Sequence, residues 1–497
     1  MVGLILNTVV GGCVMMVVPL PPFGTQRGTE EIESLQVGVS TREEVRQALG
    51  SPSRLVGDRR YEIFELSEED FNLFWLLAIG MGGGGGVSPV GESHHRMLVE
   101  YGPDEVLRSL HWEAIGDLPS DAPAPSAETA REISTWERPE RSISSVAVAP
   151  SGRYLAVDYS VRPDKVPPSA TSLMQVRDRA SGELLQEIEN GPPGCPQLSG
   201  PGEHGRQSTA FLSDGIRLAN IARDGVVCIW DPTTQRGVVT LNPGKAPVTH
   251  LAAARTAPIL ASGHANELVK VWNGTSGLEV TSISPCSVKP GCIRGNALAL
   301  SDDGRLLATA QRPRTVTLWD AVTGTELAEI TQAPAFPSPR LALSSAPERL
   351  AIHLGDHVQI WRLRQAAPAE SEGVPRPSDV TVELEQVLLL PYGCSDSRRL
   401  TDGSTVFAFP SEQPSLGFSH DGTRFAAGEG SVVVWETASW RQIWRADAGC
   451  ADSRWDRGFV LTLDGGAIVT DQGIWQLPGP SEGRNGPEAK SDPADEV

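Results

Sequence analysis

The chain has 497 residues, which is more than one hydrophobic core accommodates and corresponds to about three domains. It carries 42 Lys and Arg against 62 Asp and Glu, a formal net charge of −20. This charge disfavours nucleic-acid partners, because binding to phosphates needs a basic surface, and an anionic membrane surface also repels the chain. The 51 Gly and 39 Pro, with only 6% aromatic residues, favour many short strands joined by turns.

The N-terminal stretch LILNTVVGGCVMMVVPLPPF is apolar and contains one cysteine. It is open to three interpretations: a buried helix of a globular core, a membrane span, or an export signal. A spanning helix needs roughly 18 to 20 continuous apolar residues, and no stretch of this sequence reaches that length. We therefore predict no transmembrane helix.

The sequence Val10-Gly11-Gly12-Cys13 resembles the lipobox of bacterial lipoproteins. The resemblance implies cleavage before Cys13, so that residues 1–12 are a signal peptide and residues 13–29 a tether lipidated at Cys13. No Lys or Arg precedes Cys13, although export signals normally begin with a basic region. The alternative is a buried core cysteine.

Residues 30–116 have the pattern of a small domain with one helix followed by a sheet. Ser40 and Glu43 have the spacing of a capping box, and Val45 and Leu49 lie one turn apart on the helix that follows. Gly50 and Pro52 end this helix. The segments RRYEIFEL, HRMLVEYG and EVLRSLHWEAI are predicted strands.

The string VGVSTREEV, followed by LGSP and a strand with an aromatic residue, resembles the SmpA/OmlA domain. This is the small α+β module of the lipoprotein subunit of the outer-membrane β-barrel assembly machine. The resemblance covers about 85 residues and is interrupted by an apolar insert. We expect residues 71–79 of the insert to form a helix that either packs on its own sheet or contacts lipid or a partner. The run GMGGGGGVS has no Gly-Lys-Ser/Thr and is not a phosphate loop.

Residues 117–131 are a Pro- and Ala-rich linker, and residues 132–477 contain a repeat. The unit is four short strands with an Asp-Gly turn, a Trp-Asp pair and a Thr-Gly turn. The unit aligns on a tryptophan at positions 230, 272, 319, 361, 435 and 475, with Arg177 in the same place upstream. The repeat predicts seven blades of a β-propeller. Residues 478–497 are predicted to be a disordered acidic tail.

The repeat resembles the WD40 family, so the expected fold is mainly β: a seven-bladed WD40-like β-propeller preceded by the small α+β domain. Two repeats keep the full signature, and four keep only its tryptophan. These residues are Trp230-Asp231, Trp319-Asp320, Trp272, Trp361, Trp435 and Trp475. The Gly-His that precedes each WD40 blade is missing, so a quinoprotein-type propeller is an alternative classification. We expect residues 132–139 to supply the last strand of the final blade.

The cysteines and histidines are the residues most able to form a disulfide or a metal site. Cys286 and Cys292 are separated by five residues and are predicted to form a disulfide in an exported protein, whereas Cys228 is predicted to be a buried thiol. His94-His95 has no Cys, Asp or Glu at ligand spacing, so we predict no metal site. No nucleophile elbow or paired-carboxylate motif is found, and we predict neither a cofactor nor an enzymatic activity.

These patterns together predict a lipid-anchored scaffold of the cell envelope, on the outer membrane and facing the periplasm. Its expected partners are envelope proteins, bound through the propeller, and the membrane, bound through the lipid anchor, with no nucleic acid. Two alternatives come from other classes. One is a propeller enzyme or a cofactor-binding envelope protein of the quinoprotein kind. The other is a cytosolic WD40 scaffold.

Overall fold

The chain of the computed structural model divides into two compact units, Met1–Ala122 (unit 1) and Pro123–Val497 (unit 2), which are described separately. The structure describes residues 8–10, 13–15, 25–26, 35–57, 60–67, 72–77, 84–89, 94–115, 131–135, 141–161, 173–189, 191, 193–195, 209–222, 225–234, 236–241, 244, 246–266, 268–284, 297–312, 315–331, 340–345, 348–355, 357–365, 380–390, 398–399, 405–406, 415–428, 431–447, 459–462, 464–470 and 473–477. The predicted tail, 478–497, lies outside them. Among the described residues, no helix is long and apolar enough to span a membrane.

The helix of unit 1, α2 (Arg42–Leu49), begins one residue later than the sequence pattern predicts. Thr41 is the N-cap and forms the capping box with Glu44. The predicted pair of Ser40 and Glu43 is therefore wrong. The Ser40 hydroxyl accepts the backbone N–H four residues earlier at 3.0 Å, so it closes the preceding turn and leaves the helix amides to Thr41.

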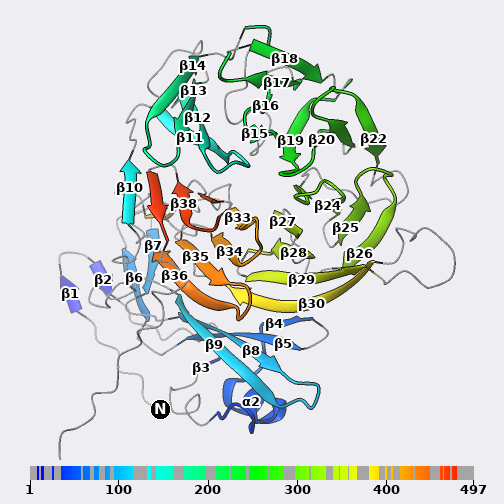
Figure 1. Ribbon diagram of the computed structural model, residues 1–497. Coiled ribbons are helices and arrows are strands. Elements are labelled where there is room, and N and C mark those ends of the chain that lie inside the picture. The colour runs from blue at the N-terminus through cyan, green and yellow to red at the C-terminus, as the bar shows by residue number, and fades with distance from the viewer. Residues whose placement is uncertain are drawn as a thin grey trace, which may run out of the picture. The chain divides into compact units, whose positions relative to one another are not determined.

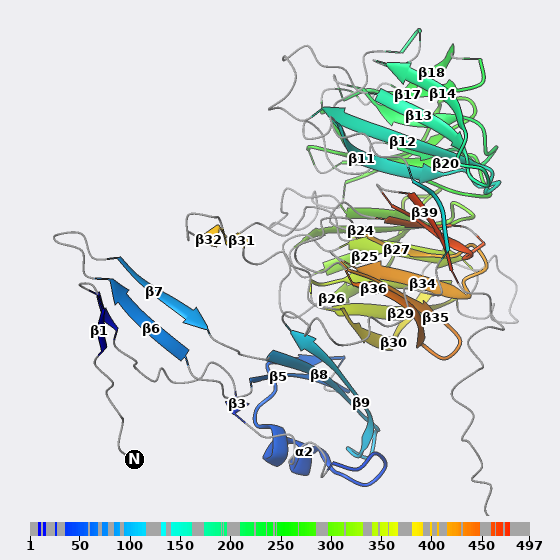
Figure 2. The same cartoon turned by 90° about the vertical axis from the view of Figure 1, so that its left-hand side faces the viewer.

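The apolar face of α2 packs on the sheet of unit 1. Val45 and Leu49 are fully buried against Phe64 and Met97, as their spacing predicts. The helix ends at Gly50, whose φ of +87° suits glycine. Figure 2 shows α2 beside the sheet.

The sheet of unit 1 contains all three predicted strands and two short ones. Its order is β3-β5-β8-β9, and β4 also pairs with β5. The strands are β3 (Thr25–Gln26), β4 (Arg54–Val56), β5 (Tyr61–Ser67), β8 (His94–Tyr101) and β9 (Leu107–Ile115).

The apolar insert of unit 1 contains strands and not the predicted helix. β6 (Asn72–Leu77) pairs with β7 (Gly84–Pro89), and Leu77 lies opposite Gly84. The prediction is wrong because the glycine-rich segment supplies a hairpin partner for β6, whose aromatic and Leu residues suit a strand equally well. The same sheet includes β1 (Thr8–Val10) and β2 (Cys13–Met15), in the order β1-β2-β6-β7.

Unit 2 is mainly β, as predicted, and its described residues include seven four-stranded antiparallel sheets. The first is β11 (Arg141–Val148), β12 (Tyr154–Val161), β13 (Leu173–Asp178) and β14 (Leu184–Glu189). The second is β15 (Thr209–Phe211), β16 (Leu218–Ile221), β17 (Val227–Asp231) and β18 (Arg236–Leu241). The third is β19 (Val248–Ala253), β20 (Ile259–His264), β21 (Val269–Asn273) and β22 (Glu279–Ile283).

The fourth sheet is β23 (Ala297–Leu300), β24 (Leu306–Arg312), β25 (Thr315–Asp320) and β26 (Glu326–Thr331). The fifth is β27 (Arg340–Ser345), β28 (Glu348–His353), β29 (His357–Gln365) and β30 (Val380–Leu389). The sixth is β33 (Ser415–Phe418), β34 (Arg424–Gly428), β35 (Ser431–Glu436) and β36 (Arg441–Asp447). The seventh combines β37 (Phe459–Leu461), β38 (Ala467–Thr470) and β39 (Gly473–Gln476) with β10 (Arg131–Thr135). A short hairpin, β31 (Arg398–Arg399) and β32 (Thr405–Val406), stands apart from them.

The first strands of the seven sheets form a cyclic series, and we call them the inner strands. They are β11, β15, β19, β23, β27, β33 and β37. Each contacts the next, and β37 contacts β11. Figure 1 shows the sheets following one another around a common centre, and Figure 2 shows β11, β12 and β13 side by side. The arrangement is compatible with a propeller.

The seventh sheet joins the beginning and the end of unit 2. β10 pairs with β39, with Arg131 opposite Gln476 and Thr135 opposite Gly473. The expectation that the segment from residue 132 supplies the outer strand of this sheet is therefore confirmed for its first residues. Pairing across the two ends of the unit removes an open sheet edge.

A side-chain hydrogen bond closes the turn after several inner strands. Ser301 Oγ donates to Asp303 at 2.6 Å and accepts the backbone N–H of Leu306 at 2.9 Å. Ser419 with Asp421, and Thr462 with Asp464, repeat this arrangement. In these three turns a Ser or Thr two residues before the aspartate thus holds the turn.

Candidate functional site

Four of the signature tryptophans are buried at the junctions between neighbouring sheets. Trp230 packs with the first sheet, Trp272 with the second and Trp319 with the third, each from the sheet that follows. Trp435 packs in the same way against the fifth sheet. Their side chains are 0 to 7% exposed. These residues are structural, because each fills a sheet-to-sheet interface.

The indole N–H of three tryptophans donates to a polar side chain ten residues earlier, on the second strand of the same sheet. Trp230 donates to Asn220 at 2.7 Å, Trp272 to Ser262 at 2.8 Å and Trp319 to Thr309 at 2.9 Å. In the third sheet Ser262 also bonds His264, whose other ring nitrogen reaches a backbone carbonyl. The buried indole N–H of each of these three tryptophans therefore has an acceptor on its own sheet.

The first and fifth sheets use a glutamine in place of that acceptor. Trp361 donates to Gln359 at 3.1 Å, and the Arg177 Nη2 donates to Gln175 at 2.8 Å. Arg177 thus makes the same kind of contact as the tryptophan whose repeat position it occupies. In the sixth sheet Phe425 stacks on Trp435 with ring centroids 5.9 Å apart.

The residue after the tryptophan closes the hairpin that leads to the outer strand. The Asp231 carboxylate accepts from the Thr233 N–H at 2.8 Å, and Asp320 accepts from the Thr323 N–H at 2.7 Å. Burial acts to raise the pKa of the Asp231 carboxyl, but hydrogen bonds from the Thr233 hydroxyl and the Thr233 N–H outweigh it and hold this pKa below its usual range. Asn273 forms the same turn with its amide oxygen. An oxygen acceptor at this position therefore closes the hairpin, and the Asn273 amide supplies one in place of the aspartate.

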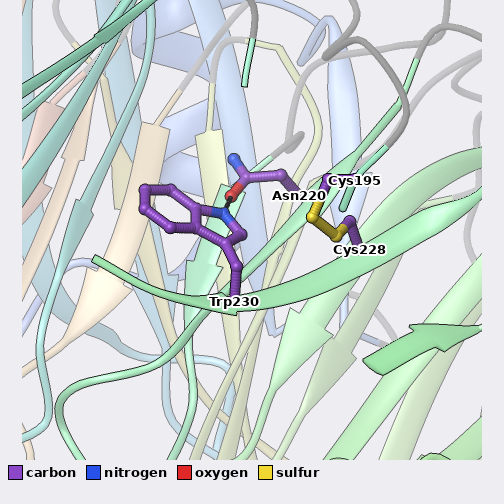
Figure 3. The surroundings of a disulfide bond; sticks show 4 residues. All are labelled: Cys195, Asn220, Cys228 and Trp230. Atoms are coloured by element: carbon purple, nitrogen blue, oxygen red, sulfur yellow. Dashed lines mark hydrogen bonds between the residues drawn. A yellow bond between two sulfur atoms is a disulfide. The ribbon is translucent and has the colours of Figure 1, made fainter. Parts of the chain in front are cut away.

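Cys228 forms a disulfide with Cys195, so the prediction that Cys228 is a buried thiol is wrong. Cys195 lies in the loop before β15, and its Cα is 5.8 Å from that of Cys228 on β17. Figure 3 shows the pair beside Asn220 and Trp230. A backbone hydrogen bond connects this loop to β18: the Gly237 N–H donates to the Pro193 carbonyl at 3.1 Å. The two cysteines are 33 residues apart in the sequence, and they pair because the loop with Cys195 folds back onto the sheet that contains Cys228.

We expect loss of this disulfide to lower the free energy of unfolding of unit 2 by about 3 to 4 kcal/mol, because the bond closes a loop of 33 residues in the unfolded chain. Denaturation of Cys195→Ala/Cys228→Ala against wild type measures this loss. Mass spectrometry of a non-reduced digest is the independent check. Recovery of the two cysteine peptides unlinked would contradict the pairing.

The inner strands enclose a cavity of about 290 Å³. All seven contribute to its wall, which is mostly Ala, Val and Leu with Gly417 on β33. Polar groups include Thr209, His250 and Arg340 near the starts of three inner strands, and Arg255 and Asp302 in the turns after two others. This cavity is the place in unit 2 to which the most sheets contribute, and it is our candidate functional site.

Three charged or ionisable side chains meet beside the cavity. Asp302 lies between Arg255, whose Nε is 3.4 Å from Oδ1, and His420, whose Nδ1 is 2.9 Å from Oδ2. The Asp302 side chain is 7% exposed, Arg255 30% and His420 50%. The three residues come from the third, fourth and sixth sheets, so the cluster connects sheets that are not all neighbours. A bond from the Thr256 N–H to the Asp302 carbonyl at 2.8 Å adds a backbone connection.

The repeat pattern does not predict this cluster, although the sequence contains two signals of it. The turn after β23 reads Ser-Asp-Asp-Gly, with Asp302 as an extra acid, and the turn after β19 has Arg255 and no Asp-Gly. Both depart from the repeat, and such departures mark the positions at which the sheets of unit 2 differ from one another.

Ser344 marks a third departure. It follows Leu343 on β27 as Ser301 follows Leu300, but the residue two positions later is Ala346 and not aspartate. Its hydroxyl is buried and has no hydrogen-bond partner among the described residues. The fifth sheet therefore lacks the side-chain bond that closes this turn in the fourth, sixth and seventh sheets.

Some of the other predicted site residues lie within the described part of the chain, and some lie outside it. Cys13 begins β2, where it lies opposite Val10 in the backbone pairing. Cys286 and Cys292 lie outside the described residues. His94 and His95 are the first residues of β8. Within the described part of the chain, no group of three or more His, Cys, Asp or Glu side chains is placed to hold a metal ion.

No protein-family model matches this chain, and no curated protein matches it either.

Proposed function

We propose that unit 2 is a seven-bladed, WD40-like β-propeller and that the protein is a scaffold that binds other proteins through it. The observation that carries the proposal is the cyclic order of the inner strands, with β37 in contact with β11 and β10 completing the seventh sheet. Seven small sheets around one axis present turns on both faces and a central cavity, and such surfaces recognise partners in many scaffolds.

Unit 1 is assigned in the proposal to an SmpA/OmlA-like domain. Its helix, followed by antiparallel strands, supports this assignment. Residues of the motif make the contacts that hold the helix on the sheet. Gly38 has a φ of +82° and donates its N–H to the Leu107 carbonyl at 2.8 Å, while Val45 and Leu49 form the buried face of α2. The motif VGVSTREEV thus connects the helix to the edge strand β9.

The proposed location is the cell envelope, with a lipid anchor on Cys13. The disulfide between Cys195 and Cys228 supports this location, because such bonds persist in oxidising compartments and are rare in a reducing cytosol. The proposed anchor needs acyl chains, because the net charge of −20 opposes attraction to anionic lipids.

We expect the full-length chain to fractionate with membranes and to retain envelope proteins after crosslinking. Cys13→Ser should leave an unlipidated precursor that loses membrane association, since two or more acyl chains are needed for stable anchoring. The intact mass of the mature N-terminus is the direct measurement. Cys450→Ser is the matched control, because it replaces a cysteine that belongs neither to the proposed anchor nor to the Cys195–Cys228 disulfide. A wild-type protein without lipid mass, or without any specifically retained protein, would contradict the corresponding half of the proposal.

A further inference from the structure

The Arg255 guanidinium on the wall of the central cavity has more donors than protein acceptors. A guanidinium has five N–H donors. Arg255 Nε is 3.4 Å from Asp302 Oδ1, and one Nη1 hydrogen points to the Phe418 carbonyl at 3.4 Å. Its other N–H groups have no acceptor among the residues that the structure describes. Both of the contacts are long for charge-assisted hydrogen bonds, which are about 2.7 to 2.9 Å.

The charge of Arg255 is also incompletely balanced. Asp302 is the acid beside it, and the same carboxylate is shared with the ring of His420 at 2.9 Å. Burial lowers the pKa of the Arg255 guanidinium, and the Asp302 charge opposes that effect. A cation that has given up part of its hydration is stabilised by a second anion.

The rest of the cavity suits a small aliphatic group. Its walls near the inner-strand middles include Ala252, Ala299, Ala342 and Gly417. A Cβ placed on Gly417 would meet no atom within 4 Å, so there is open space at that position. The volume of about 290 Å³ is at the small end of ligand pockets.

We propose that the central cavity binds a carboxylate with a short aliphatic body, and that Arg255 holds the two carboxylate oxygens through paired N–H groups. The inference deepens the proposed binding role of the propeller and rests on it. The carboxylate comes either from the C-terminus of a partner chain or from a free organic acid. Both sources present the same planar anion, which a guanidinium recognises bidentately.

The probes are butyrate and the peptide acetyl-Ala-Ala-Ala with a free C-terminus, titrated calorimetrically into the full-length chain in carboxylate-free buffer. The controls on the ligand side are butyramide and the amidated peptide. We expect the acids to bind and the amides to bind at least about tenfold more weakly, because the charged pair is lost. Tighter binding of the peptide indicates a protein C-terminus, and equal or tighter binding of butyrate indicates a free acid. Equal binding of acid and amide, or no binding of either acid, overturns the proposal.

The protein-side test compares Arg255→Gln with Arg153→Gln. Arg153 lies on the turn after β11, is 68% exposed and does not line the cavity, so its substitution controls for charge alone. We expect Arg255→Gln to weaken acid binding at least about tenfold and Arg153→Gln to leave it unchanged. If Arg255→Gln does not fold, Arg255→Lys keeps the charge but loses the paired N–H geometry, and it should also bind the acids more weakly. Unchanged affinity in the folded Arg255 variant overturns the proposal.

The two proposals fail separately. If envelope proteins are retained by wild type and by Arg255→Gln alike, and the acids do not bind, the scaffold function stands and the carboxylate site falls. If the acids bind through Arg255 but no protein is retained, the carboxylate site stands and the scaffold function falls.

Discussion

Trp319→Ala should lower the free energy of unfolding of unit 2 by about 3 to 5 kcal/mol, the range for removing a buried tryptophan. Trp319 is 7% exposed and packs between its own sheet and the third, against residues such as Ala254 and Ile259. The substitution leaves a void at that junction and removes the donor to Thr309. Denaturant unfolding of wild type and variant measures the difference.

Two further variants separate the contributions to this loss. Thr309→Val removes only the acceptor of the indole N–H and should cost about 1 to 3 kcal/mol, because a buried donor is left unpaired. Val322→Ala, on the adjacent turn, changes a side chain that is 51% exposed and should stay within about 0.5 kcal/mol. A Trp319→Ala protein as stable as Val322→Ala would show that Trp319 does not join the sheets.

The repeat in unit 2 could be read from the sequence because each of its signals is local. An Asp-Gly turn, a Trp with an acceptor after it and a Thr-Gly turn each specify one hairpin, and these hairpins occur at the expected places. Asp231 and Asp320 show why the signature holds: their carboxylates close the turn that directly follows them. Local chemistry of this kind needs no knowledge of the tertiary fold.

Features that depend on distant residues were missed or wrong. The partner of Cys228 is 33 residues away and was not foreseen, because spacing alone cannot fix a disulfide. The insert at 71–79 was assigned to a helix because an apolar run fits both states when its pairing partner is unknown. In the candidate site, His420 and Asp302 are 118 residues apart, and only the tertiary arrangement of the fourth and sixth sheets brings them together.

The buried acid of unit 1 was also invisible in the sequence. Glu62 on β5 has an exposed fraction of 0% and faces two arginines of α2. It accepts hydrogen bonds from both Arg46 Nη2 and, at 3.1 Å, the Tyr101 hydroxyl, and its Oε1 is 3.8 Å from Arg42 Nε. The bond to Glu62 raises the pKa of Arg46. In the strand pattern Glu62 reads as an ordinary exposed acid, and only the position of the helix reveals its partners.

Glu62→Ala should therefore destabilise unit 1 by about 3 to 5 kcal/mol, because it leaves the Arg42 side chain, 12% exposed, without its buried counter-charge. Glu105→Gln is the matched control: Glu105 is 68% exposed and 3.5 Å from the same Arg42, so the loss of its charge should cost about 1 kcal/mol or less. Thermal unfolding of the full-length chain, monitored by hydrogen exchange of α2 and β5, measures both. Equal destabilisation by the two variants would mean that the Glu62 pairs do not hold the helix on the sheet.

The pH dependence of unit 1 gives the same network a second test. Burial, followed by the negative charge of Glu62, raises the pKa of the Tyr101 hydroxyl above its usual value of 10.0. The unfolded chain therefore releases this proton at a lower pH than the folded chain does. The contribution of Tyr101 to stability is complete below pH 10 and is lost as the pH rises further. In Glu62→Ala the charge that helps to raise this pKa is absent, so the loss of stability above pH 10 should be shallower than in wild type. An identical slope in the two proteins would show that the Glu62 carboxylate does not act on Tyr101.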